Sequence, residues 1–68
     1  MKRELAEEII RNALAFFEPT NVLFRSVKQI EDENIKNDIM IEVELLTKHS
    51  TKLIFKVISK YPDLNPFK

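Results

Sequence analysis

The segment Lys36–Lys60, KNDIMIEVELLTKHSTKLIFKVISK, constrains the fold most, because large apolar side chains occupy both its odd and its even positions. β-Branched and aromatic residues are dense on either side of a short polar stretch, Lys48-His49-Ser50. This pattern favours two strands joined by a loop over one long buried helix. A strand with one face in water needs apolar residues at a single parity. Either the fold or a partner therefore has to cover the additional apolar side chains.

The predicted strands cover residues 38–46 and 53–58 and form an antiparallel hairpin. With Thr47 opposite Thr51, the loop has an odd number of residues, which agrees with the absence of an Asn-Gly or Asp-Gly turn. This register separates the two faces of the hairpin. The predicted inner face consists of Ile39, Ile41, Val43, Leu45, Leu53, Phe55 and Val57.

The first residues predict an amphipathic helix over Lys2–Phe17, since apolar side chains fill one half of a helical wheel. Pro19 is expected to end that helix just after Glu18. Residues 21–30 fit a strand or a helix, and we favour the strand. Residues 61–68 contain two prolines, which predict an extended tail. Three of its side chains are placed to dock it: Tyr61, Leu64 and Phe67.

The predicted architecture is one small α+β domain over residues 1–68. An N-terminal amphipathic helix packs on a three-stranded antiparallel β-meander, and an extended C-terminal tail follows. An all-helical bundle is the alternative. Neither arrangement implies an activity, because small folds of this kind serve many unrelated functions.

Charge and composition narrow the function further. Eleven basic residues balance eleven acidic ones, so no net field attracts polyanions or membranes. The chain has no cysteine and one histidine, which excludes a disulfide, a thiolate metal site and an imidazole cluster. We expect no cofactor, no small-molecule ligand and no membrane contact, in a cytoplasmic protein. A chain this short has a marginal core, which dense packing or oligomerisation has to support.

Two groups of residues carry elements of catalytic chemistry. Asp38, Glu42 and Glu44 resemble a divalent-metal nuclease set, but no lysine follows the second carboxylate, and we interpret them as a solvated strand face. The second group is His49, Ser50 and Thr51. Neighbours in a loop seldom point at one another, as nucleophilic catalysis requires. The prediction is a protein that is not an enzyme.

Four apolar residues remain on the outer face of the predicted sheet: Met40, Leu46, Ile54 and Ile58. Apolar side chains among balanced charges are typical of a small protein interface. We expect a non-catalytic interaction or regulatory module that forms a homodimer or binds another protein through them. The competing explanation is that the tail, or a helical segment 21–30, covers the same residues.

The alternative function is nucleic-acid binding through Lys52, Lys56 and Lys60, which share one face of the predicted strand with Ile54 and Ile58. Platforms for single strands also need aromatic side chains for base stacking, and this stripe has none. The simpler interpretation is an edge strand that lysines protect from unwanted pairing.

Overall fold

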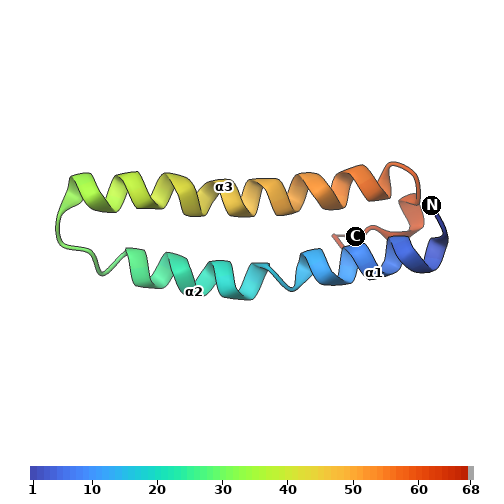
Figure 1. Ribbon diagram of the computed structural model, residues 1–68, viewed down its shortest axis with the longest axis horizontal. Coiled ribbons are helices and arrows are strands. Elements are labelled where there is room, and N and C mark those ends of the chain that lie inside the picture. Colours follow the sequence, from blue (N-terminus) through green and yellow to red (C-terminus); the bar gives the residue numbers. More distant parts are fainter. Residues whose placement is uncertain (68) are drawn as a thin grey trace.

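The chain forms a long helical hairpin in a computed structural model that describes residues 1–67 (Figure 1). α1 spans Arg3–Leu14 and α2 spans Phe17–Val27, and together they form one side of the hairpin, here called the α1–α2 arm. α3 spans Glu33–Ile58 and runs antiparallel to that arm. A short 3-10 turn, η1, spans Pro62–Leu64. The molecule is a rod of 47 × 20 × 16 Å.

The bounds of α3 follow from a capping residue and a proline. The Asp32 side chain accepts hydrogen bonds from the backbone N–H groups of Asn34 and Ile35, at 2.9 and 3.1 Å. It thereby satisfies two of the donors that a helix start leaves free. No glycine or proline occurs after that cap until Pro62. The sequence therefore allows 26 uninterrupted helical residues.

Pro19 explains why the α1–α2 arm is interrupted. Proline has no N–H, so the bond that position 19 would donate to the carbonyl of Ala15 is missing, and its ring crowds that carbonyl. Ala15 and Phe16 form the break, and Pro19 falls in the first turn of α2, where a free N–H is not needed. The Thr20 side chain donates a hydrogen bond of 2.6 Å to the carbonyl of Phe16, which fixes the start of α2.

The two sides of the hairpin meet along a stripe whose positions are alternately three and four residues apart. This spacing keeps side chains on the side of a helix that faces its neighbour. Every position of the pattern is buried or half-buried. We call this stripe the seam, made of Ala6, Ile10, Ala13, Phe17, Thr20, Phe24 and Val27 on the α1–α2 arm and Lys36, Met40, Val43, Thr47, Ser50, Ile54, Val57 and Tyr61 opposite.

The best-packed part of the seam lies near the chain ends. Ile54 has an exposed fraction of 0% and sits in one cluster with Ala6 and Ala13, whose small side chains let the helices approach closely. Towards the middle the seam contains Thr47 and Ser50, which bury little apolar area. The hairpin therefore depends on a short stretch of dense packing.

The tail closes the open end of the hairpin. Tyr61 and Leu64 pack against the core cluster. The Tyr61 hydroxyl donates a hydrogen bond to the carbonyl of Met1, and Arg3 pairs with Asp63. Hydrogen bonding to Asp63 raises the pKa of the Arg3 guanidinium. The ring of Phe67 lies 6.5 Å from that of Phe17 and 5.8 Å from that of Phe55, measured between centroids.

The predicted α+β meander is wrong, because residues 1–67 contain no strand. The segments 38–46 and 53–58 belong to α3, and most of 21–30 belongs to α2, so the all-helical alternative describes the chain. The expected loop at Lys48-His49-Ser50 is helical. A hairpin turn there favours residues with positive φ, and none of the described residues has one.

Two predictions about the chain ends are partly right. The N-terminal helix is confirmed, although it stops at Leu14, before the expected Phe17. The tail was expected to be extended, but Pro62–Leu64 forms a helical turn, and Lys68 lies outside the described residues. The three predicted docking residues of the tail do contact the hairpin.

The depth of burial predicts how α3 responds to truncation. Ile54→Ala removes a fully buried side chain and is expected to lower the free energy of unfolding by about 2–5 kcal/mol, and Ile54→Val by about 0.5–1.5 kcal/mol. Ile41→Ala is the control, since Ile41 is 55% exposed, and it should change stability by about 0.5 kcal/mol or less. Urea unfolding at one protein concentration measures all three. Equal losses at positions 41 and 54 would contradict the fold.

Candidate functional site

A second apolar surface runs along one side of the hairpin, next to the seam. Its side chains are large, apolar and exposed, with Phe16 at 61% and Leu46 at 52%. We call it the second apolar face, made of Leu5, Phe16 and Leu23 on the α1–α2 arm and Ile35, Ile39, Leu46 and Leu53 on α3.

The residue spacing places these side chains on one side of both arms. Phe16 and Leu23 are seven residues apart, as are Ile39, Leu46 and Leu53. Seven residues make almost two whole turns, so each set forms a stripe beside the seam. At 100° per residue, both stripes are displaced from the seam in the same rotational sense. In an antiparallel pair of helices, that sense puts both stripes on the same side of the molecule.

A groove between the two arms confirms this placement. Its volume is about 450 Å³. It is lined by α2 and the residue before it on one side and by α3 on the other. Phe16 and Leu23 line it together with Leu46 and Leu53. The remaining lining residues are Pro19, Thr20, His49 and Ser50. The middle of the second apolar face is thus a hollow bordered by large apolar side chains.

The chain exposes more surface than its mass requires. Its accessible area is 5269 Å². A compact protein of 8.1 kDa exposes about 4,500 Å². Its radius of gyration, 14.8 Å, also exceeds the roughly 11 Å of a compact chain of this length. Two layers of helix cannot enclose all the apolar side chains that this sequence carries.

The structure separates the four residues predicted to form an interface. Leu46 lies on the second apolar face. Met40 is half-buried in the seam, and Ile54 and Ile58 are buried in the core cluster, against α1 and the tail residues Tyr61 and Leu64. For Ile54 and Ile58, self-coverage by the chain is therefore the explanation that the structure supports.

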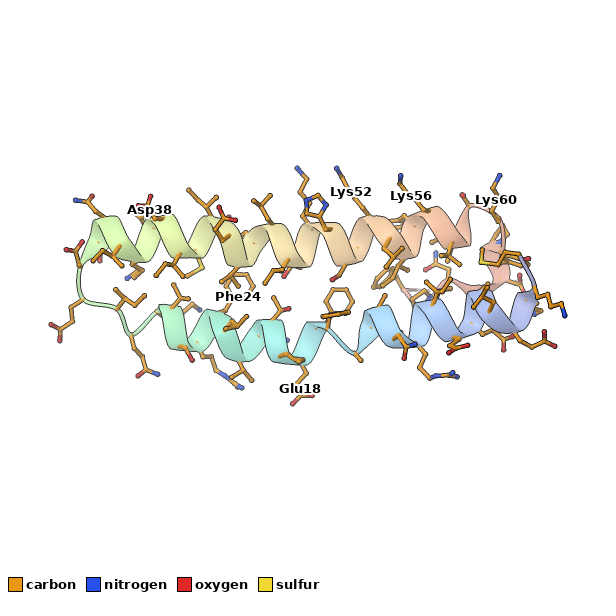
Figure 2. All side chains as sticks on the ribbon, viewed as in Figure 1. Glu18, Phe24, Asp38, Lys52, Lys56 and Lys60 are labelled. Atoms are coloured by element: carbon orange, nitrogen blue, oxygen red, sulfur yellow. The ribbon has the colours of Figure 1, made fainter. Side chains whose placement is uncertain are left out.

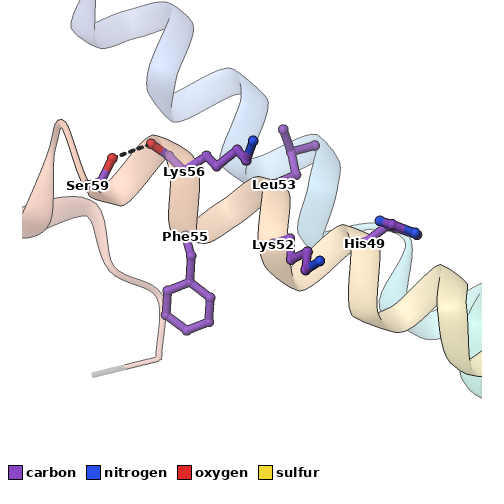
Figure 3. A pocket seen from close by; sticks show the side chains of 6 residues that line it. All are labelled: His49, Lys52, Leu53, Phe55, Lys56 and Ser59. Atoms are coloured by element: carbon purple, nitrogen blue, oxygen red, sulfur yellow. Dashed lines mark hydrogen bonds between the residues drawn. The ribbon is translucent and has the colours of Figure 1, made fainter.

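The three lysines predicted to share a face, here called the lysine stripe, do lie on one side, but of a helix and not of a strand. Lys52, Lys56 and Lys60 point away from the α1–α2 arm (Figure 2). Close by is a shallow hollow lined by His49, Lys52, Leu53, Phe55, Lys56 and Ser59, where the Ser59 hydroxyl donates a hydrogen bond of 2.7 Å to the carbonyl of Lys56 (Figure 3). Phe55 is the one aromatic ring of this hollow, and it is paired with Phe67.

The two candidate catalytic groups are not assembled. Asp38, Glu42 and Glu44 are exposed along α3, and no group of three potential metal ligands occurs among residues 1–67. His49 is exposed, whereas the next two residues, Ser50 and Thr51, are half-buried. Successive residues of a helix point about 100° apart. None of the helices in the part of the chain described is long and apolar enough to cross a membrane.

Sequence reasoning missed most of the second apolar face. Phe16 was assigned to the apolar half of a single helix, while Ile39 and Leu53 were assigned to the inner face of a sheet. The signal that identifies them is the seven-residue interval from Ile39 to Leu46 to Leu53, which is a helical and not a strand period.

Comparisons with models of protein families, with curated proteins and with solved structures find no match to this chain.

Proposed function

We propose that the chain is a non-catalytic interaction module that pairs with a second copy of itself through the second apolar face. Two hairpins stacked on these faces form a four-helix bundle with one continuous core. The observation that carries the proposal is the apolar stripe beside the seam, which extends over both arms. A hairpin that only had to pack on itself needs the seam and no more.

The exposed area is consistent with a dimer of this size. Each chain exposes about 800 Å² more than a compact protein of the same mass. A standard protein interface buries about 800 Å² on each partner. Burying that area would leave each chain with about the exposed surface of a compact protein of its own mass. It would also cover Phe16, which lies at the break between α1 and α2 and lines the groove.

The composition of the face suits a second copy as its occupant. The middle of the face is apolar, and charged residues such as Asp38, Glu42 and Lys56 lie on the α3 positions further from the seam, as in the rim of an interface. A two-fold dimer places the same surface on both sides, so the groove of one copy meets the apolar side chains of the other.

The central residue of the face predicts how the dimer can be broken. Leu46→Glu would bury an unpaired carboxylate and should raise the Kd of the dimer by about 100-fold or more. Ile41→Glu is the matched control, because Ile41 is 55% exposed and lies on the side of α3 away from the seam and the second apolar face. Light scattering after size exclusion should give about 16 kDa for wild type and the control and 8.1 kDa for Leu46→Glu.

Two results would contradict the proposal. One is a wild-type mass of 8.1 kDa at about 100 µM chain, well above a micromolar Kd. The other is a dimer that Leu46→Glu leaves intact while the variant keeps its helical circular dichroism. A variant that loses its helical signal is replaced by Leu46→Ala, which removes the contact without introducing a charge.

A second candidate function is polyanion binding by the lysine stripe. One observation favours it: residues 45–60 contain Lys48, Lys52, Lys56 and Lys60 and no acidic residue. Phosphate contacts by these side chains would be strongly salt-dependent. A fluorescent 20-nucleotide single strand is the probe, and Lys56→Glu should weaken its binding several-fold at low salt. Absence of binding at about 20 mM salt would remove this candidate.

A further inference from the structure

α3 has opposite charges on its two halves. Residues 33–44 contain four acidic side chains and one basic one, whereas residues 45–58 contain three lysines and no acidic residue. Glu31 and Asp32 just before the helix and Lys60 just after it extend this separation. The sign changes at the middle of the helix, since α3 runs from Glu33 to Ile58. Charge balance over the whole chain conceals this separation.

Two identical faces can stack with two-fold symmetry in two ways. In the first, the loops between α2 and α3 lie at the same end, and each α3 packs on the α1–α2 arm of the other copy. In the second, the loops lie at opposite ends, and the two α3 helices pack on each other in antiparallel orientation. Both arrangements bury the second apolar face, so the hydrophobic effect does not distinguish them. The charges that border the face do.

On α3 three of the four bordering positions carry charge, and on the other arm only one does. At 100° per residue, the α3 positions just outside the face are Asp38, Glu42, His49 and Lys56. The corresponding positions on the α1–α2 arm are Glu8, Asn12, Pro19 and Ser26, of which only Glu8 is charged. With the loops at one end, Lys56 would lie level with Glu8 of the second copy. Asp38 and Glu42, however, would face bordering side chains without a positive charge.

With the loops at opposite ends, the acidic half of each α3 meets the lysine half of the other. If the two-fold axis passes the helix midpoint, Glu42 faces His49 of the second copy, and Asp38 lies about one turn from Lys56 of the second copy. Each pair occurs twice because of the symmetry. Like charges are also kept apart, which matters more for orientation than for affinity.

We infer that the dimer is an antiparallel four-helix bundle with its loops at opposite ends, oriented by the charge separation along α3. This inference rests on the proposed dimer and adds its orientation. It assigns Asp38, Glu42, His49 and Lys56 as the residues that select the orientation.

The loop position provides a direct test, because the chain has no cysteine of its own. A spin label at Glu31→Cys marks the loop, and electron-electron double resonance measures the separation between the two labels. Loops at opposite ends predict a separation comparable to the 47 Å length of the rod. Loops at the same end predict less than about 25 Å, since each helix with its side chains is about 10 Å wide.

A label at Lys48→Cys is the control, because this exposed residue lies near the middle of α3. It should report a short separation in either orientation. A short separation at position 31 would overturn the inference and leave the dimer in place. No dipolar coupling at either position would overturn the dimer as well.

Charge reversal tests the selecting residues. Glu42→Lys should raise the Kd of the dimer several-fold at low salt, since it removes a negative charge opposite the lysine half of the second copy and adds a positive one there. The double variant Glu42→Lys, His49→Glu places opposite charges at these two positions across the antiparallel interface and should return the Kd to the wild-type value or below. Failure of the second substitution to recover the Kd would contradict the proposed pairing.

Discussion

The structure depends on the seam, where two antiparallel helical arms meet at positions alternately three and four residues apart. The same spacing continues through the break at Ala15 and Phe16, so α1 and α2 behave as one arm towards α3. The core cluster around Ile54 fixes one end of the seam, and the tail adds Tyr61 and Leu64 to that cluster. Without these contacts α3 would be an isolated helix and would lose the tertiary packing from which most helical stability in proteins comes.

A hairpin has only two layers, and this limits what it can bury. Positions beside the seam lie at the edge of the helix pair and stay partly in water, whatever residue occupies them. Here those positions hold Phe16, Leu23, Leu46 and Leu53. A third and a fourth helix would cover them, and in the proposed dimer a second copy would supply both. The proposed dimer would thus explain both the small size of the chain and the length of its apolar surface.

The sequence predicts some of these features and misleads on others. The N-terminal helix was predictable, because eight apolar residues fill one half of its wheel. α3 was misread, because Ile39, Ile41, Val43 and Leu45 alternate as in a strand and are mostly β-branched. In the α3 helix these alternating residues point to different sides, so that Val43 lies in the seam and Ile41 is exposed. Two local signals support the helix: the Asp32 cap and the lack of any glycine for a turn near His49.

The excess of apolar residues predicts a partner, and this stays a prediction, but the residues assigned to its surface were mostly the wrong ones. The predicted set was Met40, Leu46, Ile54 and Ile58, and on a helix Leu46 no longer shares a face with the other three. On a helix, Ile54 turns into the seam and Leu46 lies beside it. Once the period of 3.6 residues is known, the second apolar face follows from spacing alone. The separation of charge along α3 is visible in the sequence without it.

Thermal unfolding at two protein concentrations, followed by the helical circular dichroism signal, tests whether the hairpin is stabilised by a second copy. Unfolding of a dimer releases two chains, so its Tm rises with concentration by mass action. We predict that a roughly hundredfold increase in concentration raises the Tm by several degrees, with a helical spectrum at both concentrations. A Tm independent of concentration would contradict the account, because the hairpin would then be stable alone with its second apolar face in water.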